Sequence, residues 1–371
     1  SLKDVLEDDP SNIELREAIA QSYVQLNQTD SAIGVYTDLL ERFPGSPSVE
    51  IALATVYSSN SQWSKAFGYY TAALNTDSLG KDTVDFILDS LYSHIHADSG
   101  SIKTIQPVIE TYARKDSADW YAHILLGGVQ LYNKQNAEAY ATIHHAILHA
   151  PDTTAALLFG MQMFIEHERY EDMFRLSREV NVASDFRIPF LRAFAYERMK
   201  KYPEAINELN ASLQLNAHFW QALSELGMDY DEMHNTEKSD SAYIAALALN
   251  PNDPVVLNNY SYGLAERGIM LDSAKEMSAR ALAADSGNAN YMDTYGWIFY
   301  KLGEYDSAAF YLQRAVQDTS VSAAVIEHLG DVRYKLGQYK EALRLWHEAL
   351  AKDESNESLK QKILENAQHD Q

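Results

Sequence analysis

The sequence predicts an all-α protein built from stacked helical hairpins, and three observations carry this prediction. The segment YGWIFYKLGEYDSAAFYLQRAV at residues 295–316 has a near copy, LGDVRYKLGQYKEALRLWHEAL, at residues 329–350, so the chain repeats itself after 34 residues. Small residues recur at fixed places in both copies. Each copy also holds a glycine between two helix-forming stretches, where a left-handed residue can end one helix before the next begins.

The matched positions explain why the two copies would fold as hairpins. Small residues are needed where two helices cross closely, and large residues fill the space beside the crossing. The copies share four small positions and one large position: Gly296 and Gly330, Gly303 and Gly337, Ala308 and Ala342, Ala315 and Ala349, and the large pair Leu312 and Trp346.

The same positions can be traced back along nearly the whole chain. We count ten full repeats, which start near residues 13, 47, 86, 120, 154, 186, 220, 254, 289 and 323. Their pattern resembles the tetratricopeptide repeat (TPR), a family with a period of 34 residues that includes multi-repeat bacterial proteins. The resemblance implies a right-handed α–α superhelix, or TPR solenoid, of about ten helix–turn–helix hairpins.

Two repeats depart from the pattern and are candidate kinks in the superhelix rather than firm domain boundaries. The third repeat has Ile105 and Tyr112 where alanines are expected, and the fifth has Met173 and Val180. From the repeat positions we expect four segments. They are residues 1–12 as the end of a preceding repeat helix or an N-terminal cap, 13–185 as repeats 1 to 5 with an irregular part near 75–119, 186–356 as repeats 6 to 10, and 357–371 as a C-terminal capping helix and tail.

The charge of the chain limits its partners. The sequence has 30 Lys and Arg against 53 Asp and Glu, a formal net charge of −23, which would repel nucleic acids and anionic membranes. One interpretation is a solvated, soluble surface; the sharper one is a preference for basic partners. No apolar run is long enough to span a bilayer. The cytoplasm and the periplasm both stay open as compartments, as does a removed signal or lipid anchor.

No residue pattern indicates catalysis, a metal or another cofactor. The chain has no cysteine, and His145 and His149 are four residues apart without a third ligand in a known motif. Acidic groups such as Asp229, Asp231 and Glu232 are interpreted as solvated charge on a helix face. We therefore expect a protein that is not an enzyme.

The resemblance to TPR proteins places the candidate binding residues. In that family the first helix of each hairpin lines a concave groove, and the matching positions here are rich in aromatic and basic residues, the types that often carry interface energy. The alternative is that some of them pack against the next hairpin. The candidates are Arg187, Phe190, Phe194 and Arg198 in the middle repeats, and Tyr262, Asp293, Trp297, Tyr300, Lys301, Tyr334 and Lys335 in the late ones.

The predicted function is a non-catalytic scaffold or adaptor that binds a peptide or protein segment in this groove. The lysine and asparagine that grip a terminal carboxylate in the chaperone-binding TPR subclass are replaced by Ser224 and Met228, so that mode is not expected. Two alternatives stay open. The chain could be the TPR portion of a larger enzyme or of a secretion or envelope-assembly machine, or it could form homo-oligomers through an end repeat.

Overall fold

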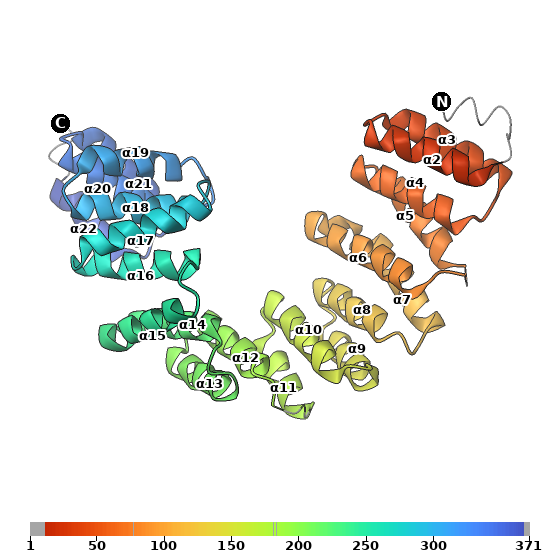
Figure 1. Ribbon diagram of the computed structural model, residues 1–371, viewed down its shortest axis with the longest axis horizontal. Coiled ribbons are helices and arrows are strands. Elements are labelled where there is room, and N and C mark those ends of the chain that lie inside the picture. Colours follow the sequence, from red (N-terminus) through yellow and green to blue (C-terminus); the bar gives the residue numbers. More distant parts are fainter. Residues whose placement is uncertain (1–11, 77, 181, 183, 367–371) are drawn as a thin grey trace. The chain divides into compact units, whose positions relative to one another are not determined.

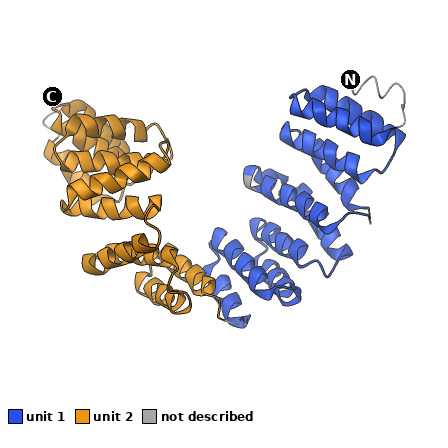
Figure 2. Ribbon diagram, in the orientation of Figure 1, with its two compact units in different colours: residues 1–183 blue, residues 184–371 orange. Residues whose placement is uncertain are grey.

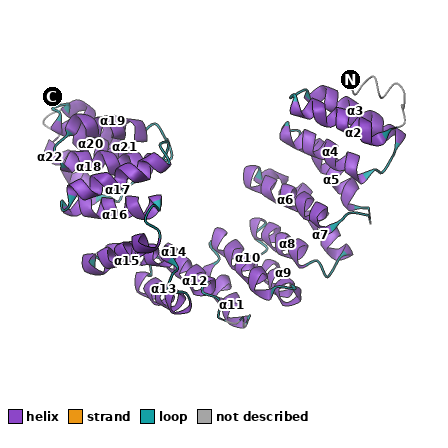
Figure 3. Cartoon of the chain, viewed as in Figure 1, coloured by secondary structure: helices purple, strands orange, loops and turns teal. Residues whose placement is uncertain are grey.

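The structure is a computed structural model that describes residues 12–76, 78–180, 182 and 184–366. Within these ranges every regular element is a helix, and no strand occurs among them (Figure 3). The predicted N-terminal segment lies outside the described residues except for Asn12, and so do the last five residues of the predicted tail.

The chain divides into two compact units, residues 1–183 and 184–371 (Figure 2). The described residues of each unit form five antiparallel helical hairpins that follow one another in sequence order (Figure 1). The helices of unit 1 are α2 (Ile13–Gln25), α3 (Thr29–Arg42), α4 (Pro47–Ser59), α5 (Trp63–Leu74), α6 (Lys81–Ala97), the short 3-10 helix η1 (Ser99–Ser101), α7 (Ile102–Lys115), α8 (Trp120–Tyr132), α9 (Asn136–His149), α10 (Thr153–Glu166) and α11 (Tyr170–Glu179).

Unit 2 ends with one helix beyond its five hairpins. Its helices are α12 (Arg187–Arg198), α13 (Tyr202–Leu215), α14 (Trp220–Glu232), α15 (Thr236–Leu249), α16 (Pro254–Arg267), α17 (Leu271–Ala284), α18 (Ala289–Lys301), α19 (Tyr305–Ala315), α20 (Ala323–Lys335), α21 (Tyr339–Lys352) and α22 (Glu357–Asn366). Leu359 and Ile363 of α22 are buried in the hydrophobic cluster of the last two hairpins.

The small positions lie where the helices of a hairpin touch, as the sequence predicts. Ala308 and Ala342 are fully buried in the cluster that joins the ninth and tenth hairpins. A Cβ atom added to Gly330 would lie 2.5 Å from Trp346 Cδ1, which is closer than any real carbon contact. The large residue of the second helix therefore fills the space that the glycine leaves open. The predicted all-α array of hairpins is confirmed.

The third hairpin shows what happens when the small residues are missing. Ile105 is completely buried where an alanine is expected, and α6 packs more extensively on α8 than on its own partner α7. A branched side chain at the crossing point keeps two helix axes apart, because side chains at the contact set the interaxial distance. The irregularity near residues 75–119 thus has a direct steric cause.

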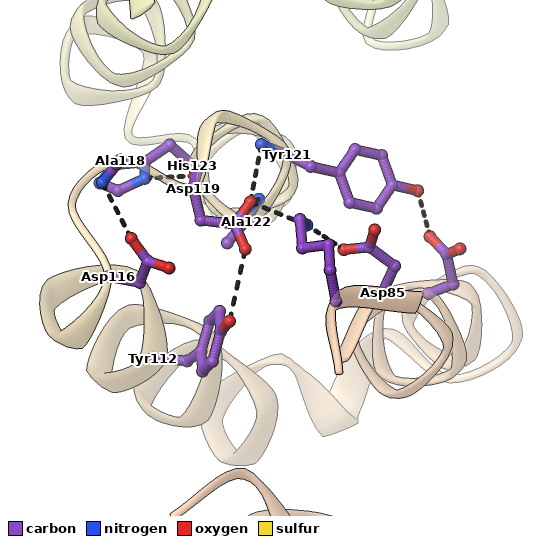
Figure 4. A network of polar contacts seen from close by, with 10 residues as sticks. Asp85, Tyr112, Asp116, Ala118, Asp119, Tyr121, Ala122 and His123 are labelled. Atoms are coloured by element: carbon purple, nitrogen blue, oxygen red, sulfur yellow. Dashed lines mark hydrogen bonds and ion pairs between the residues drawn. The ribbon is translucent and has the colours of Figure 1, made fainter. Parts of the chain in front are cut away.

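A polar network at the start of α8 connects the helices of this loosely packed region. Asp119 caps α8 by accepting hydrogen bonds from the backbone N–H groups of Tyr121 and Ala122, both at 3.1 Å (Figure 4). Its other oxygen accepts from the hydroxyl of Tyr112 on α7 at 3.4 Å. Lys81 of α6 lies 3.0 Å from the same carboxylate. One buried aspartate therefore joins three helices, and we assign this cluster a structural role.

Except in the third hairpin, where no residue between α6 and α7 has a positive φ, the hairpins turn through a left-handed residue, whether or not it is glycine. Gly303 and Gly337 have φ values of +81° and +75°, which confirms their predicted role at the ends of first helices. The equivalent turns of other hairpins use residues with side chains, among them Lys200 and His234 at φ values of +57° and +55°. A side chain in this conformation costs free energy that glycine avoids.

Replacing His234 with glycine is therefore expected to stabilise unit 2 by about 1 kcal/mol. His234 is exposed, so the substitution removes no buried contact. Calorimetric melting of the full chain measures the effect. His234→Ala is the matched control, because it removes the imidazole but keeps the Cβ. Equal melting temperatures for the glycine and alanine variants would show that the left-handed turn carries no strain.

Candidate functional site

The first helices of the hairpins in unit 2 line an open cavity. It has a volume of about 900 Å³, and residues of α12, α14, α16, α18 and α20 line it. Two second helices contribute to its wall through Tyr202 of α13 and Tyr243 of α15. The cavity is therefore a surface shared by all five hairpins of the unit, as is typical of stacked repeats.

Four of the predicted groove residues line this cavity, namely Phe194, Arg198, Tyr262 and Asp293. Phe194 and Tyr262 are half-buried, and the Arg198 guanidinium is exposed and lies over the Phe194 ring, 5.1 Å from its centroid. The cavity therefore has aromatic walls near its middle hairpins, as the residue types suggested.

Three other candidates from the middle and late repeats lie outside the cavity lining. Arg187 is exposed and forms an ion pair with Asp185 at 2.6 Å. Phe190 packs edge-on against Phe219, with ring centroids 4.8 Å apart. Lys335 is exposed at the end of α20. These side chains could meet a partner only beyond the cavity.

The late aromatic residues pack mainly against one another. Trp297 is only 7% exposed and stacks between Tyr300, at 4.6 Å between ring centroids, and His328, at 4.0 Å. The Lys301 ammonium lies 4.9 Å from the centre of the Trp297 ring. Tyr334 packs against Trp346 with tilted rings, whose centroids are 5.5 Å apart. For Trp297 the structure therefore shows the packing that was the alternative to groove exposure.

Asp293 forms a buried pair that sequence reasoning did not find. Its Oδ1 lies 2.8 Å from Nδ1 of His328, and both residues are buried at the cavity wall. Burial opposes a charge on His328, but the carboxylates of Asp293 and Asp331 outweigh it and raise the pKa of the imidazole. The two residues are 35 positions apart, one repeat plus one residue, so the same inner face brings them together.

A second group of acidic residues in the cavity was missed. We call Glu197, Glu225, Asp229 and Asn258 the acidic recess; all four line the cavity. Asp229 is only 2% exposed, so its interpretation as solvated charge was wrong. Glu225 and Asp229 share one face of α14 because they are four residues apart. That spacing on a first helix was the available signal.

The recess has unusual electrostatics. Burial, followed by the charges of Glu225 and Glu232, raises the pKa of Asp229 to about 7. Burial, followed by the charges of Glu225 and Asp229, raises the pKa of Glu197 to about 8, although Arg198 opposes the shift. Burial also raises the pKa of Glu225. Near neutral pH the recess therefore holds protons that ordinary carboxylates would have lost.

Outside this cavity the described residues show fewer features that indicate a binding site. No group of three His, Cys, Asp or Glu side chains among them is placed to hold a metal ion, and His145 and His149 simply stack at 4.1 Å. In unit 1 a smaller hollow of about 490 Å³ is lined partly by Trp63 and His94, whose rings stack at 3.9 Å. None of the helices in the described ranges has both the length and the apolar character that a membrane span requires.

Comparison with known proteins identifies the repeats. The family model described as "Tetratricopeptide repeat" matches residues 18–46, in the first hairpin and the turn that follows it. The model described as "Anaphase-promoting complex, cyclosome, subunit 3" matches residues 268–349, across the late hairpins. The hairpins are tetratricopeptide repeats. Proteins with the TPR fold typically mediate protein interactions.

Individual TPR relatives are distant. A TPR repeat-containing protein of Pseudomonas aeruginosa is 28% identical over 121 residues, which is 33% of this chain but only 18% of that relative. The crystal structure of the APC/C hetero-tetramer Cut9–Hcn1 is similar with a TM-score of 0.53 at 14% identity, covering 96% of this chain and 77% of that one. The yeast Tom70 structure is 12% identical with a TM-score of 0.45, covering 100% and 90%. These likenesses concern the fold alone.

Proposed function

We propose that the chain is a non-catalytic scaffold or adaptor whose second unit holds a peptide or protein segment in the cavity along its first helices. The observation that carries this proposal is the continuity of the cavity across α12, α14, α16, α18 and α20. An extended segment bound there would contact all five hairpins. Half-buried aromatic side chains provide contact area at a low cost in conformational entropy.

The chemistry of the cavity favours a basic partner. Its lining contains six acidic residues and two residues that can carry positive charge, Arg198 and His328, and His328 is already paired with Asp293. The chain as a whole has a formal net charge of −23, so long-range attraction would also bring basic segments to it. Nucleic acids and anionic membranes would be repelled by the same field.

Binding in the cavity can be tested without knowing the natural partner. A random-peptide display library is selected on the full chain, and the affinity of enriched peptides is measured for the wild type and for Phe194→Ala/Tyr262→Ala. We expect the double variant to weaken binding at least tenfold, because truncation of aromatic anchors commonly costs about 2 kcal/mol or more.

The matched control is Phe310→Ala, which deletes an aromatic ring from the second helix α19, where Phe310 is 56% exposed. This variant should bind the enriched peptides as the wild type does. Peptides that are lost equally from both variants, or a library that yields no peptide above background, would contradict the proposal. Circular dichroism melting of each variant establishes that it is folded.

A further inference from the structure

The acidic recess contains hydrogen-bond acceptors that the protein itself leaves unused. Oδ2 of Asp229, Oε1 of Glu197 and Oδ1 of Asn258 are enclosed and have no hydrogen-bond partner among the described residues. Asp229 and Asn258 are more than nine-tenths buried, and both line the cavity. Buried polar atoms are rarely left unpaired in native structures, because each one costs free energy.

Two carboxylates elsewhere in unit 2 show how the chain can supply a basic partner from its own residues. Asp240 pairs with Arg267 at 2.6 Å, and Glu208 pairs with Arg192 at 2.8 Å. In the described part of the chain no lysine or arginine forms an ion pair with a carboxylate of the acidic recess, although Arg198 stands at its edge over Phe194. The carboxylates of the recess therefore differ from Asp240 and Glu208, which are paired with arginines of the same chain.

The tenth hairpin shows how this inner surface holds a cation when one is present. Lys362 of α22 reaches α20, where its ammonium lies 2.9 Å from Asp331 and also contacts Glu327. The same ammonium lies 5.5 Å from the centre of the Trp346 ring. Two carboxylates of one first helix and an aromatic face thus bind one basic side chain. Glu225, Asp229 and the aromatic walls of the cavity offer the same chemistry.

We propose that the acidic recess binds the guanidinium group of an arginine in the partner segment; this inference rests on the proposed function and specifies its ligand. Arginine fits better than other cations for geometric reasons. Its planar group has five N–H donors, which can satisfy acceptors that converge from α12, α14 and α16, and it stacks on aromatic rings such as Phe194. The lysine ammonium has three donors and acts as a point charge.

Arginine binding should release protons. Besides Glu225 within the recess, the titratable and charged groups of the cavity lining are the carboxyls of Asp231, Glu232 and Asp293, the guanidinium of Arg198, the imidazole of His328, and the phenols of Tyr202, Tyr243, Tyr262 and Tyr291. A guanidinium within the recess would favour the ionised forms of Glu197 and Asp229, whose pKa values lie near 8 and 7 when the recess is empty. The affinity for arginine should therefore rise as the pH increases from 6 to 8.5.

The probe for the test is N-acetyl-arginine amide, whose guanidinium is its sole charge. Isothermal titration of the full chain at pH 8, in buffers of different ionisation enthalpy, measures both affinity and proton release. We expect binding in the millimolar range with net proton release. The neutral citrulline analogue and the lysine analogue should each bind at least tenfold more weakly.

Variants locate the binding. Glu197→Gln/Asp229→Asn should weaken the arginine probe at least tenfold, whereas Glu237→Gln should leave its affinity within twofold. Glu237 is an exposed acid in the first turn of α15, so its substitution controls for the change in net charge. If circular dichroism shows that the double variant is unfolded, the single variant Asp229→Asn takes its place in the affinity measurement.

Three results would overturn the inference. The first is no binding of the arginine probe at concentrations up to about 20 mM, and the second is equal affinity for the lysine analogue. The third is an equal loss of affinity for the arginine probe in the recess variant and in the control variant. The outcome is separate from that of the proposed function. Peptides that bind through Phe194 and Tyr262 without any dependence on arginine would leave the scaffold standing and remove the arginine site. Binding of the arginine probe without any peptide selected from the library would support the arginine site and contradict the scaffold function.

Discussion

Replacing Trp346 with alanine is expected to destabilise the end of unit 2 by about 4 kcal/mol, the usual cost of deleting a large buried aromatic side chain. Trp346 is 2% exposed and fills the space opposite Gly330. Its indole N–H donates to Oδ1 of Asp331 at 2.9 Å. The alanine variant would leave a cavity against a glycine that cannot fill it, so little relaxation can recover the loss.

Calorimetry of the full chain measures the loss of stability in Trp346→Ala, and two further variants serve as comparisons. Trp346→Phe keeps most of the ring volume but loses the hydrogen bond to Asp331, so its loss should fall well below that of alanine. Phe310→Ala deletes an aromatic ring that is largely in solvent and should change stability by less than about 0.5 kcal/mol. A loss for Trp346→Ala as small as that for Phe310→Ala would contradict the packing described for the tenth hairpin.

The same substitution should also loosen α22. Lys362 contacts the Trp346 ring and the carboxylate of Asp331, and Leu359 is buried in the same cluster. Limited proteolysis should then cut the alanine variant near residue 357 sooner than the wild type. If sites in the other hairpins are cut at the same rate in the alanine variant and in the wild type, the effect is confined to the last hairpin and α22.

The fold could be predicted from the sequence because the repeat is encoded in residue size. Fully buried alanines such as Ala308 and Ala342 stand where helices cross, and Leu312 and Trp346 stand where the crossing leaves space. These contacts are local, within one hairpin or between neighbours, so a spacing of 34 residues determines them. Even the departure at Ile105 could be interpreted in advance, since a large residue at the crossing must separate two helices.

The candidate site could be predicted only in part. The position of Trp297 on the first helix predicts that it faces inward, but whether it is exposed depends on His328, which comes from the next hairpin and covers it. Likewise, Asp229 looks like any acid on a polar helix face. Its burial arises from the cavity wall that α12 and α16 build on either side of α14, and helical periodicity carries no information about those neighbours.

The protein should become less stable as the pH rises, because of the acidic recess. In the unfolded chain Glu197 and Asp229 lose their protons near pH 4, whereas in the fold their pKa values are about 8 and 7. The folded state therefore binds more protons between these limits, so the free energy of unfolding falls as the pH rises from about 4 to about 8 and then levels off.

Glu197→Gln/Asp229→Asn removes both groups and should remove this part of the pH dependence. At pH 8.5 the variant is expected to melt about 3–6 °C above the wild type, and at pH 4 the two should nearly coincide. Glu237→Gln, which deletes an exposed charge, should follow the wild type at every pH. Melting curves of the double variant and the wild type that shift in parallel with pH would show that these carboxylates are not protonated in the fold. A millimolar arginine probe that raises the melting temperature of the wild type alone at pH 8.5 would show that a cation offsets the same cost.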